Sequence, residues 1–142
     1  MRVRKTRNDT DFWYCQYDPT VQHIVVDENG HETGEIVPHY GAATPYWANV
    51  SPAAGAAQFE QFGNMGNYDR VIVTRDMTCP INENSVLFLE KEPEYTELRT
   101  EETVDGKTTT VVYLLPKYDY LVKNVAKGLD AIAIAVRKVD VG

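Results

Sequence analysis

Residues 49–75 read NVSPAAGAAQFEQFGNMGNYDRVIVTR and contain a short segment, bounded at both ends, whose pattern predicts a helix. Ser51 can cap its first turn, Pro52 fits the first helical position, and Gly63 suits the left-handed conformation that ends a helix. The four alanines between these ends are strong helix formers. A Gly-Asn-rich link then leads into the β-branched residues 71–74, which favour a strand. The stretch predicts a short helix, a link and a strand, in that order.

The apolar segments around this stretch predict strands. Residues 12–17 are rich in aromatic side chains, which pack well on a pleated surface, and we expect Asp18 and Pro19 to end this strand. Residues 86–89 form a brief apolar run whose length favours a buried strand over a helix.

Three pairs of strand-like segments flank turn-forming residues and predict hairpins. The pairs are residues 23–26 and 34–37 around Asn29-Gly30, residues 95–104 and 107–115 around Asp105-Gly106, and residues 120–126 and 131–139 around Gly128 and Asp130. The third pair has a helical alternative, because Leu121, Val122, Val125 and Leu129 recur at helical spacing. The strict alternation of large and small side chains in residues 131–136 favours the strand.

The amino-acid composition of the hairpin at residues 94–115 changes along its length. Its limbs are charged and rich in threonine near the turn, and only residues 111–115 at its base are apolar. The tip has little to bury. It is either a mobile, solvated ribbon or an arm that lies on a partner.

The chain of 142 residues is 43% hydrophobic and 25% charged, which is enough for one domain with one core. We predict a mainly β fold: a small β-barrel or sandwich with one short helix in a long loop, residues 38–69, and a protruding hairpin, residues 94–115. Residues 1–10 form a basic N-terminal arm.

The composition also excludes some functions. A net charge of -7 makes the chain a poor non-specific binder of nucleic acid. No apolar run is long enough to cross a membrane, and the N-terminus lacks the apolar core of a signal peptide, so we expect an intracellular protein. Cys15 and Cys79 are too few for a disulfide framework and are expected to be reduced thiols.

Few residues suggest chemistry. His23, His31 and His39 could build a metal site with Glu28, Glu32 or Glu35, but their spacing matches no compact ligand pattern and we expect solvent-facing histidines. Neither serine stands in a nucleophile elbow, and residues 63–66 lack the lysine of a phosphate-binding loop. We therefore predict no catalytic residue, no cofactor, no metal and no enzymatic activity.

Two segments exceed what an isolated domain needs. Arg2, Arg4, Lys5 and Arg7 crowd the N-terminus of an otherwise acidic chain, where they either contact solvent or dock on an acidic neighbouring subunit. The long connection at residues 38–68 is the second segment, and long ordered loops tend to carry function.

Several short stretches resemble one family. They are Asn49-Val50-Ser51-Pro52-Ala53 with Gly55, Phe62-Gly63, Tyr68-Asp69-Arg70-Val71-Ile72, Ile81-Asn82-Glu83-Asn84-Ser85, and Tyr118-Asp119-Tyr120-Leu121-Val122-Lys123 with Val125-Ala126-Lys127. In this order they resemble the head-closure, or stopper, proteins of long-tailed bacteriophages, which belong to the head-to-tail connector.

The resemblance implies a small β-barrel that assembles as a homo-oligomeric ring, a dodecamer, in the virion after synthesis in the bacterial cytoplasm. Portal and adaptor proteins would contact its head side, and tail-completion or tail-terminator proteins its tail side. Packaged double-stranded DNA would pass through the lumen without sequence-specific binding, and an acidic lining would reduce friction because it does not hold phosphates. No membrane is involved.

The resemblance also assigns residues by position. The channel or gating loop would contain Gly41, Ser51, Gly55, Gln58, Glu60, Gly63, Asn64, Gly66 and Tyr68. The subunit or partner interface would contain Arg2, Arg4, Lys5, Arg7, Arg99, Glu101, Glu102, Asp105, Gly106 and Lys107.

Two alternatives stay open. Another neck component, such as a tail-completion protein, would share these physical traits. A monomeric β-barrel that binds a small ligand or carbohydrate is the other, since Trp13, Trp47, Tyr40 and Tyr46 could form a stacking surface.

Overall fold

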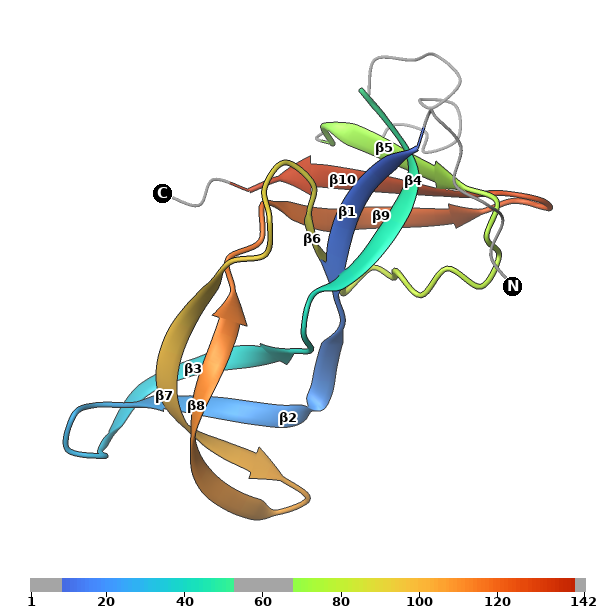
Figure 1. The fold of residues 1–142 in the computed structure, drawn as a ribbon. Coiled ribbons are helices and arrows are strands. Elements are labelled where there is room, and N and C mark those ends of the chain that lie inside the picture. Colours follow the sequence, from blue (N-terminus) through green and yellow to red (C-terminus); the bar gives the residue numbers. More distant parts are fainter. Residues whose placement is uncertain (1–8, 53–67, 140–142) are drawn as a thin grey trace.

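The computed structural model describes residues 9–52 and 68–139, which form ten strands and no helix (Figure 1). Six strands close into a barrel in the order β1-β4-β5-β10-β9-β6, and four form a sheet in the order β3-β2-β7-β8. The barrel strands are β1 (Thr10–Cys15), β4 (Thr44–Pro52), β5 (Arg70–Thr74), β6 (Val86–Phe88), β9 (Tyr120–Lys127) and β10 (Ile132–Lys138). The sheet strands are β2 (Tyr17–Val26), β3 (Glu32–Tyr40), β7 (Tyr95–Val104) and β8 (Lys107–Pro116). The predicted β class and the barrel are confirmed.

The barrel interior is a packed apolar core. In β10 the large residues Ile132, Ile134 and Val136 point inward, while Ala133 and Ala135 lie on the outer wall, as the alternation predicted. Phe12 of β1 and Tyr120 of β9 are 1% exposed and fill the same interior. Side chains of the described residues therefore occupy the lumen of the barrel, as in other small barrels.

All three predicted hairpins are confirmed. The β7–β8 turn places Asp105 at φ 51° and Gly106 at φ 79°, the two positive angles of a type I′ turn. The β2–β3 turn is of a different type: Gly30 has a positive φ of 80° and Asn29 does not, and the Gly30 N–H donates to the Asp27 carbonyl at 3.0 Å. In the β9–β10 turn the Gly128 N–H donates to the Ala131 carbonyl at 2.8 Å. The short run at residues 86–89 is also a strand, β6.

Asp18 and Pro19 do not end a strand, contrary to the prediction. The chain leaves the barrel after Cys15, and β2 then includes both residues. The register of β2 with β3 is irregular between Tyr17 and Gln22, so Pro19 lies where the ladder is interrupted and its missing N–H costs little.

The expected long loop contains a strand that the sequence did not reveal. Residues 44–52 form β4, which pairs with β1 on one side and β5 on the other. Ser51 and Pro52 lie opposite Val71 and Arg70 in this ladder, so they extend a strand and do not cap a helix. The remainder of the predicted helix and its link, residues 53–67, lie outside the described residues.

The tip of the 94–115 hairpin is not a free ribbon. Strand β2 pairs with β7 from Val21↔Val104 to Val25↔Thr100, beside the charged and threonine-rich half. The hairpin is thus half of a four-stranded sheet, which Figure 1 shows extending away from the barrel.

The sheet joins the barrel through polar contacts and an aromatic cluster. Cys15, Val86 and Phe88 form the buried centre of this cluster, and Trp13, Tyr40, Ala43, Tyr118 and Leu121 pack around it. The Ala43 N–H donates to Tyr95 Oη at 3.1 Å, which ties the β3–β4 link to the base of β7. The carboxylate of Asp119 accepts the Leu89 and Glu90 N–H groups at 2.9 and 2.8 Å, so it fixes the link between β6 and β7. These contacts set the orientation of the sheet.

Candidate functional site

One face of the four-stranded sheet is uncovered by the described residues. The strand register brings Ile36, Ile24 and Glu101 side by side, and it places Val112 beside Arg99 and Leu114 beside Glu97. Ile36 and Val112 are each 58% exposed and Leu114 is 51% exposed. We call these seven residues the open face: Ile24, Ile36, Glu97, Arg99, Glu101, Val112 and Leu114. Large exposed apolar side chains gathered on one surface are typical of a binding surface.

A hollow of about 300 Å³ lies where the open face meets the β2–β3 turn. Its lining residues are Val26, Asp27, Glu28, Glu97, Arg99 and Val112. Asp27 Oδ1 accepts the N–H groups of Asn29 and His31, both at 2.9 Å, so this carboxylate is used by the turn. Glu28 and Glu97 remain as carboxylates at the hollow. An occupant that combines an apolar stem with a positive head would match this lining.

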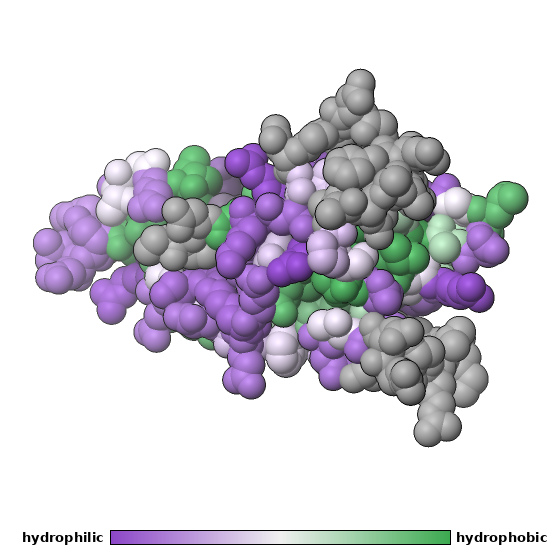
Figure 2. Space-filling model, turned by 90° about the horizontal axis from the view of Figure 1, so that it is seen from above, coloured by the Kyte–Doolittle hydropathy of each residue, from purple (hydrophilic) through white to green (hydrophobic). Residues whose placement is uncertain are grey.

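The net charge of the chain is concentrated in this sheet. Residues 17–40 and 95–116 hold nine of the 21 acidic residues and two of the 14 basic ones, which gives -7, the same net charge as the whole chain. The remaining residues therefore contain equal numbers of acidic and basic side chains. In Figure 2 the sheet, at the left, is mainly hydrophilic with isolated hydrophobic patches. The sheet is the acidic part of the molecule.

Two carboxylates crowd each other on this sheet. The pKa of Glu101 is raised, first by a hydrogen bond to the Glu32 side chain, then by desolvation and by the negative charge of Glu32. Among the described residues, the lysines and arginines in ion pairs lie outside the sheet: Arg70 and Lys138 contact Glu90, and Lys91 and Lys117 contact Glu94. A cation placed near Glu32 and Glu101 would lower their mutual repulsion.

The opposite face of the sheet holds a buried stack of two histidines and a tyrosine. His23 is fully buried, with Nδ1 at 2.9 Å from Thr100 Oγ1 and Nε2 at 2.7 Å from His39 Nδ1. The Tyr113 ring stacks on His23 at 3.9 Å between centroids, and Tyr113 Oη accepts the Tyr40 N–H at 2.7 Å. The four strands each contribute a residue to this network, which we call the histidine stack: His23, His39, Thr100 and Tyr113. It holds β8 against the end of β3, at the two edges of the sheet.

The expectation of solvent-facing histidines is wrong for His23. Burial lowers its pKa, the charge of His39 lowers it further, and Glu102 partly opposes these effects. The side chain of His31, 79% exposed beside Asp27, does face solvent. No group of three or more His, Cys, Asp and Glu side chains suited to a metal is found within residues 9–52 and 68–139.

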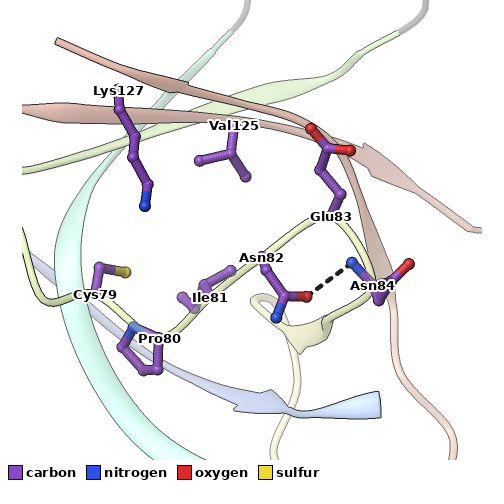
Figure 3. A pocket seen from close by; sticks show the side chains of 8 residues that line it. All are labelled: Cys79, Pro80, Ile81, Asn82, Glu83, Asn84, Val125 and Lys127. Atoms are coloured by element: carbon purple, nitrogen blue, oxygen red, sulfur yellow. Dashed lines mark hydrogen bonds between the residues drawn. The ribbon is translucent and has the colours of Figure 1, made fainter. Parts of the chain in front are cut away.

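A second hollow, of about 640 Å³, lies beside the barrel (Figure 3). Its lining residues are Cys79, Pro80, Ile81, Asn82, Glu83, Asn84, Val125 and Lys127. Asn82 Oδ1 accepts the Asn84 N–H at 2.9 Å and organises the turn. Figure 3 shows Cys79 and Glu83 at opposite ends of the hollow, so this thiol and this carboxylate are not in contact. Cys79 and Cys15 are both free thiols, and burial raises the pKa of Cys15 to about 11.

The structure describes three of the nine residues predicted for the gating loop, and these three belong to different elements. Gly41 lies in the β3–β4 link next to the sheet, and its N–H donates to the Gln16 carbonyl at 2.9 Å. Ser51 is in β4, and Tyr68 is buried just before β5. The other six, Gly55, Gln58, Glu60, Gly63, Asn64 and Gly66, lie outside the described residues.

The residues predicted for the interface divide into two groups. Arg99, Glu101, Glu102, Asp105, Gly106 and Lys107 all belong to the β7–β8 hairpin, but only Arg99 and Glu101 lie on the open face, since Glu102 shares the face of His23. Arg2, Arg4, Lys5 and Arg7 are outside the described residues. The prediction did not include Ile36, Val112 and Leu114, although the apolar alternation of β8 around Tyr113 could have revealed the last two.

The aromatic residues considered for ligand stacking do not share one surface. Tyr46 points into the barrel core and Tyr40 lies at the junction with the sheet, whereas the β1–β4 register places Trp13 and Trp47 on the outer side of the wall. No helix in the described ranges is long and apolar enough to span a membrane.

Comparisons of the chain with protein-family models, curated proteins and solved structures give no match.

Proposed function

We propose that this chain is a head-closure protein of a long-tailed bacteriophage, a structural subunit that forms a ring below the portal and adaptor, retains packaged DNA and receives the tail. The short stretches quoted in the sequence analysis support the family. The closed barrel supports it too, because a small barrel is the fold which that resemblance implies.

The observation that carries the proposal is the open face of the projecting sheet. Ile36, Val112 and Leu114 are more than half exposed, on a sheet that leads away from a barrel whose own core is complete. An isolated domain gains nothing from such a surface, while a subunit of a ring uses it to contact its neighbours.

The packed barrel interior supports a ring of several copies. Side chains of the described residues fill the barrel interior, so a DNA channel requires copies arranged around a common axis. The acidic sheet would repel phosphates, and we therefore assign the sheet to protein partners and not to DNA.

The test is genetic, in the phage or prophage that encodes this chain. An amber mutation in its gene should yield filled heads that lose DNA and do not join tails, seen by electron microscopy and by nuclease sensitivity of the packaged DNA. A suppressor host should restore normal particles, which is the control.

Normal virions from the amber mutant would contradict the proposal. Filled heads that resist nuclease but lack tails would contradict head closure as well, and would favour a tail-completion component.

A further inference from the structure

We propose that the open face is the docking site for residues 1–8 of a neighbouring copy of this chain. The inference rests on the proposed function, because it names the partner of the surface which that proposal assigns to subunit contacts. It specifies one occupant, the basic segment MRVRKTRN.

The chemistry of the open face fits arginine side chains. Val26 and Val112 line the hollow together with the carboxylates of Glu28 and Glu97. An arginine can lay its methylene stem on valines while its guanidinium donates paired hydrogen bonds to a carboxylate. Arg99 lies at the same hollow, and its positive charge repels a second cation. Glu97 and Glu101 lie on either side of Arg99 on the open face, and their negative charges offset this repulsion.

Charge complementarity selects residues 1–8 as the occupant. This segment contains four basic residues and no acidic one, whereas the sheet holds nine acidic and two basic residues. Glu32 and Glu101 lie close enough for their side chains to share a hydrogen bond, and an approaching cation would offset the repulsion between their negative charges. Met1 and Val3 supply apolar side chains that can contact Ile36 or Leu114, which are more than half exposed.

The reach of the segment favours a neighbouring copy over the same chain. Strand β1 begins at Thr10 and runs toward the sheet, so residues 1–8 would have to pass back along its six residues, about 20 Å at 3.3 Å per residue. They would then have to follow β2, which Figure 1 shows leading away from the barrel, for about 20 Å more. Eight extended residues span at most about 28 Å, less than the roughly 40 Å of chain path that these two strands span, so a neighbouring copy is the better-fitting occupant.

Binding of a labelled peptide tests the surface directly. The probe is a fluorescent peptide of residues 1–8, and the protein is the chain that lacks these residues, with binding followed by fluorescence anisotropy at low ionic strength. We expect saturable binding that weakens at high salt and at least about tenfold with Glu97→Lys and Glu101→Lys together.

Two further variants keep this test specific. Glu83→Lys with Glu92→Lys makes the same change of charge outside the open face and should bind the peptide within about twofold of the parent chain. Glu97→Gln with Glu101→Gln is the milder version and should still weaken binding, so an effect of misfolding is separated from an effect of the surface. Equal binding by the open-face and control variants, or no saturation by the parent chain, would overturn the inference.

Cross-linking decides between neighbouring copies and the same chain. A photo-reactive residue in place of Arg4, in a mixture of isotopically light and heavy full-length chains, should give light–heavy cross-links to residues of β7 or β8. Cross-links confined to one chain would refute docking between copies.

In the phage, deletion of residues 1–8 should block ring assembly. Normal assembly of that variant, in a phage whose amber mutant still leaks DNA, would overturn this inference and leave the proposed function standing.

Discussion

The barrel and the sheet are both built from antiparallel strands, but different interactions hold them together. The barrel encloses aliphatic and aromatic side chains, with Ile72, Leu87 and Ile134 completely buried. At the centre of the sheet lie His23 and Thr100, equally buried and joined by a hydrogen bond. Apolar burial is non-directional and gives most of the stability of a fold, whereas a buried hydrogen-bond network demands one arrangement of its members. The barrel therefore supplies most of the stability, and the sheet presents a surface with one defined arrangement of side chains.

The largest expected effect is on the barrel. Phe12→Ala removes a buried ring from the core and should lower the free energy of unfolding by about 3–5 kcal/mol, measured by urea denaturation with tryptophan fluorescence. Both tryptophans, Trp13 and Trp47, lie in barrel strands and report on this part. Leu114→Ala is the control, since a side chain 51% exposed on the open face should cost less than about 1 kcal/mol. Similar losses in the two variants would show that the barrel core is not the main source of stability.

Truncation within the histidine stack should act on the sheet. His23→Ala removes the partner of Thr100 and of His39 and leaves a cavity beside the Tyr113 ring, so we expect a loss of about 2–3 kcal/mol. Hydrogen exchange should speed up at the amides of β2, β3, β7 and β8 and stay nearly unchanged in the barrel. His31→Ala, at an exposed turn, should change neither. Uniformly faster exchange in both parts would mean that sheet and barrel unfold as one unit.

The pH dependence of stability follows from the same side chain. The pKa of His23 is lowered in the folded chain from the ordinary value of 6.5, so the unfolded chain binds the proton more readily. The contribution of neutral His23 is therefore present above pH 6.5 and is lost as pH falls below it, with a slope of at most about 1.4 kcal/mol per pH unit for one proton.

His39 and Glu102 also face His23, and their charges act on its pKa in opposite directions: His39 lowers it and Glu102 raises it. Unfolding by urea at pH 7.5, 6.5 and 5.5 measures the loss, and His23→Gln should flatten it. An equal slope in wild type and His23→Gln would assign the pH dependence to other groups.

The sequence predicted what depends on local signals and missed what depends on distant partners. Asp105-Gly106 favours a tight turn with positive φ angles at adjacent residues, and this turn was predicted correctly. The alternation of large and small side chains in residues 131–136 favours a strand, and β10 was predicted correctly for that reason. Strand β4 was missed because Ser51 and Pro52 mimic the start of a helix although they end a strand. The histidine stack was missed because His23 and Thr100 are 77 residues apart, and no local pattern shows that β2 and β7 pair.

The smallest expected effect concerns the junction between the two parts. Tyr95→Phe removes the hydroxyl that accepts the Ala43 N–H and should lower the free energy of unfolding by about 1 kcal/mol. Tyr17→Phe is the matched control, because Tyr17 is 38% exposed and its contact with Tyr40 is through the ring, and it should change stability by less than about 0.5 kcal/mol. The informative measurement is whether the tryptophan transition of the barrel and the hydrogen exchange of the sheet shift together. A joint shift means that the junction transmits stability from barrel to sheet, since Tyr95 begins β7 and Ala43 precedes β4. If Tyr95→Phe changes the hydrogen exchange of the sheet alone, the sheet unfolds locally while the barrel stays intact. In the proposed ring, neighbouring copies would then bind a sheet that becomes fully ordered only on contact.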